Sequence, residues 1–447
     1  MTSPRTTNAA DWAARDAAVV WHGFTQMATY DRTTPITVER AEGRTLIDVD
    51  GKRYFDGISS LWVTTLGHRV PELDAALVDQ VGKVAHSTLL GNGNRAAIEF
   101  AEALAAVVPV DDAHVMFASD GAVAVEQALK VAFQYWANRG EPDRTQFLAL
   151  GGAYHGDSVG ALSLGDGGFG TELFDPLRFP VLRTPGYAEA DWADKAVAVL
   201  ERHAPELVAL VIEPLVQGAS GMLTAEPVDL ARVGRACRDR GVLLICDEVA
   251  TGFGRTGRLF ASEWGYLRPD ILCLGKGITG GYLPLSATVA SGPVFAAFAG
   301  PDLGERTFYH GHSYGGNALA CAVGLRHLQL LAEWDVLANV TTTAGALTKA
   351  LGDRIASQPG VGAVRQRGLM AGIELAPPPG GERWGRRVCA RAVEQGVLLR
   401  PLGDVVVVMP PLTTTVAEIE YVVEVLAGAI TAVWAEDGPS PLAEASQ

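Results

Sequence analysis

The amino-acid sequence predicts an α/β protein whose large domain is built on a mostly parallel sheet. Between residues 114 and 291, short apolar runs alternate with helical patterns. These runs are apolar throughout rather than at every second position, which is typical of strands that are buried on both faces. Charged residues follow several runs, at the carboxyl edge where such sheets bind their ligands.

The individual elements follow from this alternation. Apolar, β-rich runs predict the strands, and apolar residues spaced three or four apart predict the helices between them. The expected strands of the large domain are residues 114–119, 147–150, 208–212, 242–246, 271–274 and 285–290, and the expected helices include 123–138 and 229–240.

A smaller α+β domain is expected after a long helix at residues 317–333. Short strands at 36–42 and 46–48, on either side of Gly43, add the N-terminal segment to it. Its other expected elements are helices 344–355, 384–395 and 416–432 and strands 363–367, 372–375 and 405–409.

The predicted domain boundaries follow from these elements. Residues 1–65 form an N-terminal segment that contributes to the small domain and the active site, residues 66–330 form the large domain, residues 331–435 form the small domain, and residues 436–447 form a tail. The polar or Pro-, Ser- and Ala-rich ends, residues 1–10 and 437–447, are expected to be disordered.

The composition narrows the functional class. With 447 residues, 48% of them hydrophobic, the chain has ample material for a large core. A net charge of −15 without Lys/Arg runs argues against nucleic acid or anionic membranes as partners, and no apolar run is long enough to span a membrane. The five scattered cysteines lack C-x-x-C spacing, which predicts reduced thiols rather than disulfides or a zinc site. We therefore expect a cytoplasmic enzyme with small-molecule substrates.

Lys276 is the residue from which the predicted chemistry starts. It follows the apolar run 271–274 between two glycines, so its amine is placed to lose its proton and form a Schiff base with an aldehyde. Asp247 directly follows the run 242–246, where a carboxylate can keep a pyridine nitrogen protonated. Taken singly, the two residues also fit a surface lysine in a glycine-rich turn and a helix cap. Together they indicate pyridoxal 5'-phosphate.

The chain resembles the class III aminotransferases of fold type I, from about position 21 to about position 434. The signature is DEVATGFGRTG at residues 247–257, followed by GKG at 275–277. Within this family it is most similar to the branch that aminates 8-amino-7-oxononanoate in biotin biosynthesis. Further matching segments are WHGFTQM at 21–27, SSLW at 59–62, YHGD at 154–157, VQGASGM at 216–222, HGHSY at 310–314 and RPLGD at 400–404.

The resemblance implies a fold and a set of cofactor contacts. It implies the aspartate aminotransferase-like fold, with a seven-stranded sheet in the large domain, and a homodimer with shared active sites. Tyr154 is expected to stack on the pyridine ring, Val249 to press on its opposite face, and Glu213 to support the region of Asp247 and the ring oxygen. A capping or salt-bridge role for Glu213 stays open. Ser313 takes the place of a threonine that, in relatives, reaches the phosphate from the neighbouring subunit.

The cofactor phosphate is assigned to the start of a helix. Asp120, Gly121 and Ala122 join the strand at 114–119 to the helix that begins near residue 123. Backbone N–H groups at a helix start attract phosphate, so Gly121 and Ala122 are the predicted contacts; a plain strand-to-helix turn is the alternative. Relatives often carry Ser or Thr in place of Ala122, so this chain retains only backbone donors there.

Substrate contacts are likewise implied by the resemblance. Arg400 corresponds to a clamp for the substrate carboxylate, which the planar guanidinium suits; a surface salt bridge is the alternative. The remaining substrate contacts are expected from Phe24, Leu61, Trp62, Arg255 and Gly311.

The amino donor differs within this branch. Members that use S-adenosylmethionine typically carry Pro-Tyr and Trp where this chain has Gly23-Phe24 and Leu61. The chain resembles instead a subgroup in which lysine is the donor. Because the lost hydroxyl and indole would have bonded to and stacked on an adenosyl group, lysine is the expected donor and S-adenosylmethionine the alternative.

Two rival functions stay open on the sequence alone. Another class III transaminase, acting on ornithine, 4-aminobutyrate or a general ω-amine, shares the pair of Asp247 and Lys276, although segments 21–27 and 400–404 argue against it. A binding or regulatory protein with the same fold and cofactor is disfavoured by the intact pair. His310 and His312 are two residues apart, a spacing that metal ligands can have. No acidic or cysteine partner lies close to them in sequence, so no metal is expected.

Overall fold

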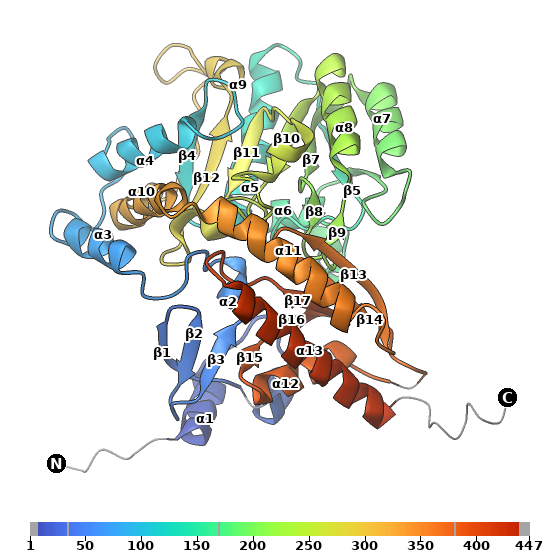
Figure 1. Ribbon diagram of the computed structural model, residues 1–447. Coiled ribbons are helices and arrows are strands. Elements are labelled where there is room, and N and C mark those ends of the chain that lie inside the picture. The colour runs from blue at the N-terminus through green and yellow to red at the C-terminus, as the bar shows by residue number, and fades with distance from the viewer. Residues whose placement is uncertain (1–7, 34, 169, 380, 438–447) are drawn as a thin grey trace.

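A seven-stranded sheet forms the centre of the larger lobe of the molecule (Figure 1). The structure, a computed structural model, describes residues 8–33, 35–168, 170–379 and 381–437. The strand order is β4-β12-β11-β10-β7-β5-β6; β12 is antiparallel to both neighbours, and the other described pairs are parallel. The predicted mostly parallel, seven-stranded sheet is confirmed. Its strands are β4 (His114–Ala118), β5 (Gln146–Leu150), β6 (Leu182–Thr184), β7 (Leu207–Ile212), β10 (Leu243–Asp247), β11 (Ile271–Leu274) and β12 (Ser286–Ala290).

Side chains of the central strands alternate between two covered faces. Ile245 and Cys273 pack in one core cluster with α5 (Gly121–Asn138). Leu244 and Leu272 pack in the other cluster, with residues of α7 (Trp192–His203) and α8 (Pro227–Arg240). Because both faces are covered by helices, these strands lack the polar alternation of a half-exposed sheet. The edge strand β6 was not predicted, since it has only three residues and includes Arg183 and Thr184.

The remaining elements of the large lobe surround this sheet. Helix α10 begins after Asn317, whose Oδ1 accepts the N–H of Ala320 at 3.1 Å, and it packs on α3 and α4. These elements are α3 (Pro71–Val81), α4 (Arg95–Ala105), α6 (Val159–Leu164), η2 (Thr171–Leu177), β8 (Val216–Gln217), β9 (Leu223–Thr224), η3 (Ala261–Gly265), η4 (Lys276–Thr279), α9 (Gly292–Ala296) and α10 (Ala318–Glu333).

The smaller lobe combines segments from both ends of the chain (Figure 1). One of its sheets has the order β13-β14-β17-β16, and the other has the order β1-β2-β3-β15, in which β15 is parallel to β3. Helix α13 packs on α11 and α12, and these two helices pack on the strands. The elements are β1 (Val38–Glu42), β2 (Thr45–Asp48), β3 (Arg53–Asp56), α11 (Val336–Arg354), β13 (Val361–Arg367), β14 (Met370–Leu375), α12 (Trp384–Glu394), β15 (Val397–Leu398), β16 (Arg400–Leu402), β17 (Val405–Val408) and α13 (Val416–Asp437).

Three expectations about element ends were wrong. Residues 8–10, expected to be disordered, start helix α1 (Ala9–Val19), where Asn8 and Asp11 form a capping box. Helix α13 runs to Asp437, past the predicted tail boundary, because Asp437 accepts the indole N–H of Trp384 at 2.9 Å. Helix α11 begins eight residues before the predicted position 344, at Val336. The rest of the two predicted disordered ends lies outside the described residues.

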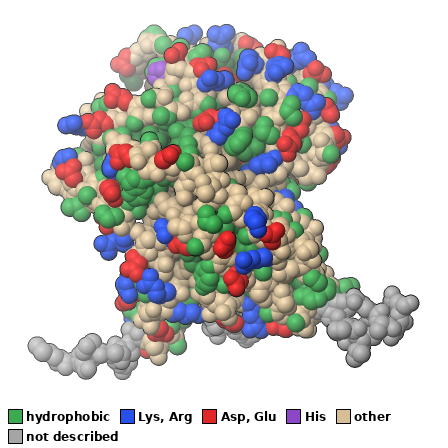
Figure 2. All heavy atoms as spheres, viewed as in Figure 1, with side chains coloured by type: hydrophobic (Ala, Val, Ile, Leu, Met, Phe, Trp, Pro, Cys, Tyr) green, Lys and Arg blue, Asp and Glu red, His purple; other side chains and the backbone are tan. Residues whose placement is uncertain are grey.

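The N-terminal segment contains two short helices, and the face of the molecule in Figure 2 is of mixed charge. The short helices η1 (Met27–Thr33) and α2 (Ser59–Trp62) lie in the N-terminal segment. On the face drawn in Figure 2, acidic and basic side chains are interspersed over both lobes. Within the described ranges, none of the helices has both the length and the apolarity needed to cross a membrane.

Candidate active site

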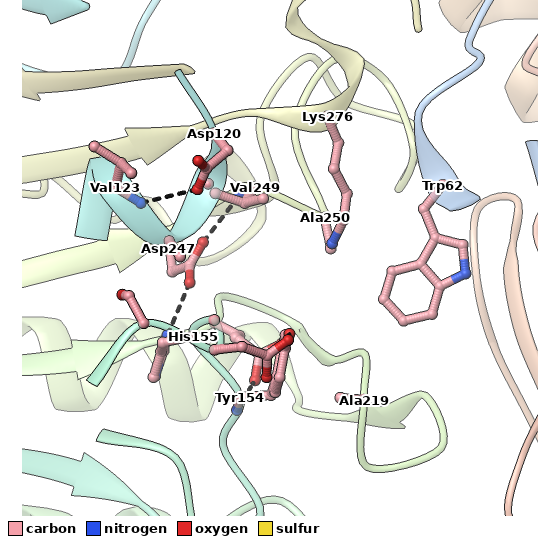
Figure 3. Close-up of a pocket in the computed structure, with 16 residues that line it drawn as sticks. Trp62, Asp120, Val123, Tyr154, His155, Ala219, Asp247, Val249, Ala250 and Lys276 are labelled. Carbon is pink, nitrogen blue, oxygen red and sulfur yellow. Dashed lines mark hydrogen bonds and ion pairs between the residues drawn. The ribbon is translucent and has the colours of Figure 1, made fainter. Parts of the chain in front are cut away.

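A cavity of about 470 Å³ opens at the carboxyl edge of the central sheet (Figure 3). It brings together Asp120, Glu213, Asp247 and Lys276, which follow or end β4, β7, β10 and β11 as the sequence predicted. Its lining consists of Trp62, Asp120, Gly121, Ala122, Val123, Tyr154, His155, Gly156, Asp157, Ser158, Glu213, Ala219, Asp247, Val249, Ala250 and Lys276.

Lys276 extends into this cavity from the first position of η4, directly after β11 (Figure 3). Its backbone lies in the left-handed region, at φ 43°, which side-chain-bearing residues rarely adopt without a functional reason. Its Nζ lies 4.7 Å from the centre of the Trp62 ring. Burial lowers the pKa of the lysine amine, while the charges of Asp247 and Glu213 oppose that shift. The site therefore favours a neutral, nucleophilic amine.

Asp247 is held in place by two hydrogen bonds. Its Oδ1 accepts the N–H of Val249 at 3.0 Å, and its Oδ2 lies 2.8 Å from Nδ1 of His155. Burial pulls the pKa of His155 down, but its hydrogen bond to Asp247 and the nearby carboxylate charges outweigh burial and raise it. Nε2 of His155 is buried without a partner among the described residues. The arrangement places the imidazole of His155 against the carboxyl group of Asp247 at the wall of the cavity.

His155 is a site residue that the sequence reasoning missed. The signal was available, because His155 directly follows Tyr154 in the segment YHGD that carried part of the resemblance. The sequence does not show that His155 pairs with Asp247, because that contact depends on β5 and β10 lying on either side of β7 and ending at the same edge of the sheet.

Glu213 and Tyr154 form the opposite wall of the cavity. Glu213 accepts the N–H of Tyr154 and the N–H of Gly218, each at 3.1 Å. Burial raises the pKa of Glu213 to about 7, although these backbone bonds and the charge of His155 oppose the shift. The hydroxyl of Tyr154 donates to Asp157 at 3.0 Å, which fixes the phenol ring at the cavity.

The N-terminus of α5 faces the same cavity. Asp120 is its N-cap, with Oδ1 accepting the N–H of Val123 at 3.1 Å. Gly121 and Ala122 follow in the first turn, and both line the cavity. A Cβ atom at Gly121 would lie 2.6 Å from Cγ1 of Val249, so only glycine fits between α5 and that side chain. First-turn N–H groups and the helix dipole give this end an affinity for anions, which the carboxylate of Asp120 reduces.

Six of the predicted site residues do not line this cavity. Leu61 and Phe24 are exposed, at 48% and 59%. Arg400 lies exposed on β16, and its guanidinium has no partner among the described residues. Gly311 and Ser313 lie in the exposed loop before α10, where the carbonyl of Ser313 accepts from His86 at 2.7 Å.

Arg255 is the sixth of these residues, and it is enclosed instead. It is 1% exposed and donates to the carbonyls of Pro410 at 2.6 Å and Thr64 at 3.2 Å. Burial lowers the pKa of this guanidinium to about 9, and the charge of Asp56 opposes the shift. Arg255 thus joins the N-terminal segment to the small lobe, and its predicted contact with substrate stays a prediction.

The two histidines considered as metal ligands lie near each other. Nε2 of His310 is 3.1 Å from Nε2 of His312, and Nδ1 of His310 is 3.0 Å from Nζ of Lys130. Burial and the charge of Lys130 lower the pKa of His310. Across the described part of the chain, no group of three His, Cys, Asp or Glu side chains is placed to hold a metal ion.

The chain is similar to proteins of one family. The family profile described as Aminotransferase class-III matches residues 26–430. A protein of Nitratidesulfovibrio vulgaris named adenosylmethionine-8-amino-7-oxononanoate aminotransferase is 44% identical over 94% of this chain and 81% of its own length. One of the same name from Anoxybacillus flavithermus is 41% identical over 94% of this chain and 96% of its own.

Solved structures show the same relationship. The crystal structure of adenosylmethionine-8-amino-7-oxononanoate aminotransferase from Methanocaldococcus jannaschii matches with a TM-score of 0.91 and 38% identity, covering 94% of this chain and 98% of that one. The ω-transaminase from Pseudomonas jessenii in complex with PMP matches with a TM-score of 0.90 and 29% identity, covering 96% of this chain and 99% of that one.

Proposed function

The chain belongs to the class III aminotransferases, and we propose that it transfers an amino group to the ketone of 8-amino-7-oxononanoate, giving 7,8-diaminononanoate for biotin biosynthesis. The observation that carries the reaction type is the presence of Lys276 and Asp247 in one cavity, at the ends of adjacent strands. The acceptor is supported by the relatives from Nitratidesulfovibrio vulgaris and Anoxybacillus flavithermus, which are named for 8-amino-7-oxononanoate.

The lining of the cavity fits pyridoxal 5'-phosphate. The amine of Lys276 is buried, with a lowered pKa, and so is available to an aldehyde. Asp247, anchored by His155, offers a carboxylate to a protonated pyridine nitrogen. Gly121 and Ala122 place the first turn of α5 at the cavity, where backbone N–H groups can bind a phosphate. When bound, the cofactor supplies an electron sink that stabilises negative charge on the carbon next to the transferred nitrogen.

The side chains around that site have separate tasks. Lys276 would attach the cofactor and, as a neutral amine, could take and return the proton of the reacting carbon. Asp247, oriented by His155, would hold a proton at the ring nitrogen. Tyr154 and Val249 would hold the ring in place. Trp62 closes the side of the cavity next to Lys276 and keeps water from its amine.

Arg400 is proposed to bind the carboxylate at the far end of 8-amino-7-oxononanoate. Its guanidinium is exposed and lacks an internal partner among the described residues, so it is free to form a bidentate pair. A carboxylate clamp at a distance from Lys276 suits a substrate whose acid group is separated from its ketone by a methylene chain.

The active enzyme is proposed to be a homodimer with shared sites. Ser313 and Gly311 lie in an exposed loop and do not line the cavity of their own chain. Large exposed side chains occur in the same loop and in the N-terminal segment, including Tyr314 at 66% and Trp21 at 89%. These exposed side chains support a dimer in which a partner chain covers the loop. Ser313 would then contact the cofactor phosphate bound by that partner chain.

The donor is proposed to be lysine, with S-adenosylmethionine as the rival. Phe24 and Leu61 lack the hydroxyl and indole expected at an adenosyl site, whereas the relatives' names carry adenosylmethionine. An aliphatic side chain next to Trp62 suits the flexible methylene chain of lysine.

The direct test offers the purified protein 8-amino-7-oxononanoate with lysine and, in parallel, with S-adenosylmethionine, and detects the diamine. Diamine formation with lysine as the better donor is the expected result. Preference for S-adenosylmethionine would overturn the donor and leave the acceptor standing. Turnover of general ω-amines with pyruvate, but none of 8-amino-7-oxononanoate, would overturn the acceptor; the likeness to the Pseudomonas jessenii enzyme makes that arm necessary.

A further inference from the structure

The turn that carries Trp62 has an unusual backbone. Ser59, Ser60 and Trp62 all lie in the left-handed region, at φ 50°, 61° and 66°. Residues with side chains adopt this conformation rarely, and a cluster of three persists only when the surroundings hold it in place. Such strain gathers at functional sites, so the contacts that maintain this turn merit a functional explanation.

Asp56 holds this turn through its carboxylate. It ends strand β3, and its side chain is fully buried. The N–H of Ser60 donates to Oδ1 of Asp56 at 2.8 Å, and the hydroxyl of Ser60 donates to Oδ2 at 3.0 Å. Nε2 of His68 lies 2.9 Å from the same Oδ2. Both carboxylate oxygens are therefore occupied, as a buried charge requires.

The backbone of the Ser59–Trp62 turn fixes the position of the Trp62 ring. The indole is 8% exposed, and its six-membered ring lies 3.2 Å from the position that a Cβ of Gly218 would occupy. The amine of Lys276 lies 4.7 Å from the ring. Ring and amine thus share one side of the cavity, and a shift of the turn would admit water to Lys276 (Figure 3).

We propose that Asp56 and His68 are positioning residues of the transamination site, which hold the Ser59–Trp62 turn so that the Trp62 ring covers the amine of Lys276. Neither residue lines the cavity. Their effect on the reaction passes through the backbone of the turn and the indole. The inference rests on the proposed role of Lys276 as the reacting amine.

His68 is also reachable from outside the active site. A separate cavity of about 220 Å³ is lined by His68, Thr64, Gly281 and Tyr282, among others. A Cβ at Gly281 would lie 2.9 Å from the backbone of Thr64, so this cavity lies directly behind the turn. Because the cavity opens onto His68, a free imidazole can enter the space that a shortened side chain leaves.

Hydrogen exchange of the intact protein tests the positioning directly. In Asp56→Ala, the segment 57–66 is expected to exchange about tenfold faster or more, because the N–H of Ser60 loses its acceptor and the turn opens. Asp48→Ala is the matched control: Asp48 is 6% exposed at the end of β2 and accepts the hydroxyl of Tyr54 at 2.7 Å, but it has no contact with the turn. Equal exchange in wild type and Asp56→Ala would overturn the proposal.

Kinetics test whether the effect passes through Trp62. Asp56→Ala is expected to lower kcat/KM by roughly tenfold to a hundredfold, the range for a misplaced site group. In a Trp62→Ala background, the same substitution is expected to change kcat/KM by less than about threefold, since the residue that it positions is gone. Full losses that multiply in the double variant would contradict a route through the indole.

Variants of His68 keep the test decisive if Asp56→Ala does not fold. His68→Gln retains an N–H donor toward Asp56 and is expected to retain most activity, whereas His68→Ala is expected to lose it and regain it with added imidazole. Failure of both rescues would remove His68 from the proposal. Hydrogen exchange does not depend on catalytic turnover. If the protein aminated none of the offered ketones, the proposed function would be wrong, but the exchange rates would still test whether Asp56 holds the turn.

Discussion

Nδ1 of His155 lies 2.8 Å from Oδ2 of Asp247, although the two residues are 92 positions apart in the chain. The contact exists because β5 and β10 both flank β7 in the central sheet and end at the same edge. The hydrogen bond to Asp247 raises the pKa of His155 against the effect of burial, and the imidazole fixes the orientation of the carboxylate.

Replacing His155 by Phe is expected to weaken cofactor binding by about tenfold to a hundredfold. A lost hydrogen bond to a charged group corresponds to roughly 1.5–3 kcal/mol, and the buried carboxylate of Asp247 would be left short of a donor. His155→Asn, whose side-chain amide can still donate to Asp247, should have a cofactor affinity between those of the wild type and His155→Phe. The dissociation constant of pyridoxal phosphate, measured by tryptophan quenching, checks this; unchanged affinity in His155→Phe would contradict it.

Replacing Lys276 by Ala is expected to abolish covalent attachment and turnover together. The wild-type protein as purified should be yellow, and borohydride should fix the cofactor to Lys276 in the wild type but to no residue in the variant. Mass spectrometry of the reduced, digested protein provides the measurement. Normal turnover by the variant would refute the assignment of the reacting amine.

Stability is expected to fall as the pH rises from 4.5 toward 7. Burial raises the pKa of Glu213 from 4.5 to about 7, so the folded protein holds a proton that the unfolded chain has released. Because the folded state binds more protons in this window, the contribution of Glu213 is greatest below pH 4.5 and is lost as the pH passes 7.

Urea unfolding at several pH values measures this slope. At about 1.4 kcal/mol per pKa unit, the contribution of Glu213 is on the order of 3 kcal/mol. Glu213→Gln should flatten the curve but leave a residual slope, because burial also raises the pKa of Glu248 to about 7. Glu201→Gln, on the exposed surface of α7, should leave the slope as in wild type.

Arg400→Ala is expected to damage the half-reaction with 8-amino-7-oxononanoate by roughly thirtyfold to two-hundredfold in kcat/KM. The loss of a charge-assisted bidentate contact corresponds to about 2–3 kcal/mol. An acceptor without the terminal carboxylate should be affected little. Equal losses with both acceptors would point to a structural role for Arg400.

Mixing two inactive variants is expected to restore part of the activity. Chains that carry Lys276→Ala and chains disabled at Ser313 would form hybrid dimers in which one site has both an intact lysine and an intact serine from the partner. Activity after mixing, compared with each variant alone, is the measurement. A demonstrably monomeric preparation with full cofactor content and full rate would exclude shared sites.

The central sheet and the pairing of Lys276 with Asp247 were predictable because both depend on short, local sequence patterns. A strand buried on both faces is apolar throughout, and a charged residue directly after it lies at the ligand-binding edge. The partners of those residues were not predictable in the same way. Asp56 and His155 look like ordinary polar residues, and their roles depend on contacts with Ser60 and Asp247 that only the folded backbone defines.

The element ends that were missed have similar causes. The tail boundary was placed too early because residues 436 and 437 adjoin an end that is polar or rich in Pro, Ser and Ala. In the structure they pair with the basic side chains of Arg387 and Arg391 on α12. Strand β6 is short and partly polar because it lies at the sheet edge.

The parallel pairing of β3 with β15 has a consequence for how this protein is made. Phe55 of β3 pairs with Val397 of β15. The sheet formed by β1, β2 and β3 is therefore complete only after almost the whole chain has been synthesised. Contacts between such distant segments close large loops and form slowly. The turn with Ser59 and Trp62 comes directly after β3, and during synthesis on the ribosome it remains without its neighbouring strand until the last part of the chain has emerged. The Trp62 side of the cavity is therefore expected to reach its final position only after β15 has paired with β3, whereas the residues around Lys276 belong to strands that are synthesised earlier.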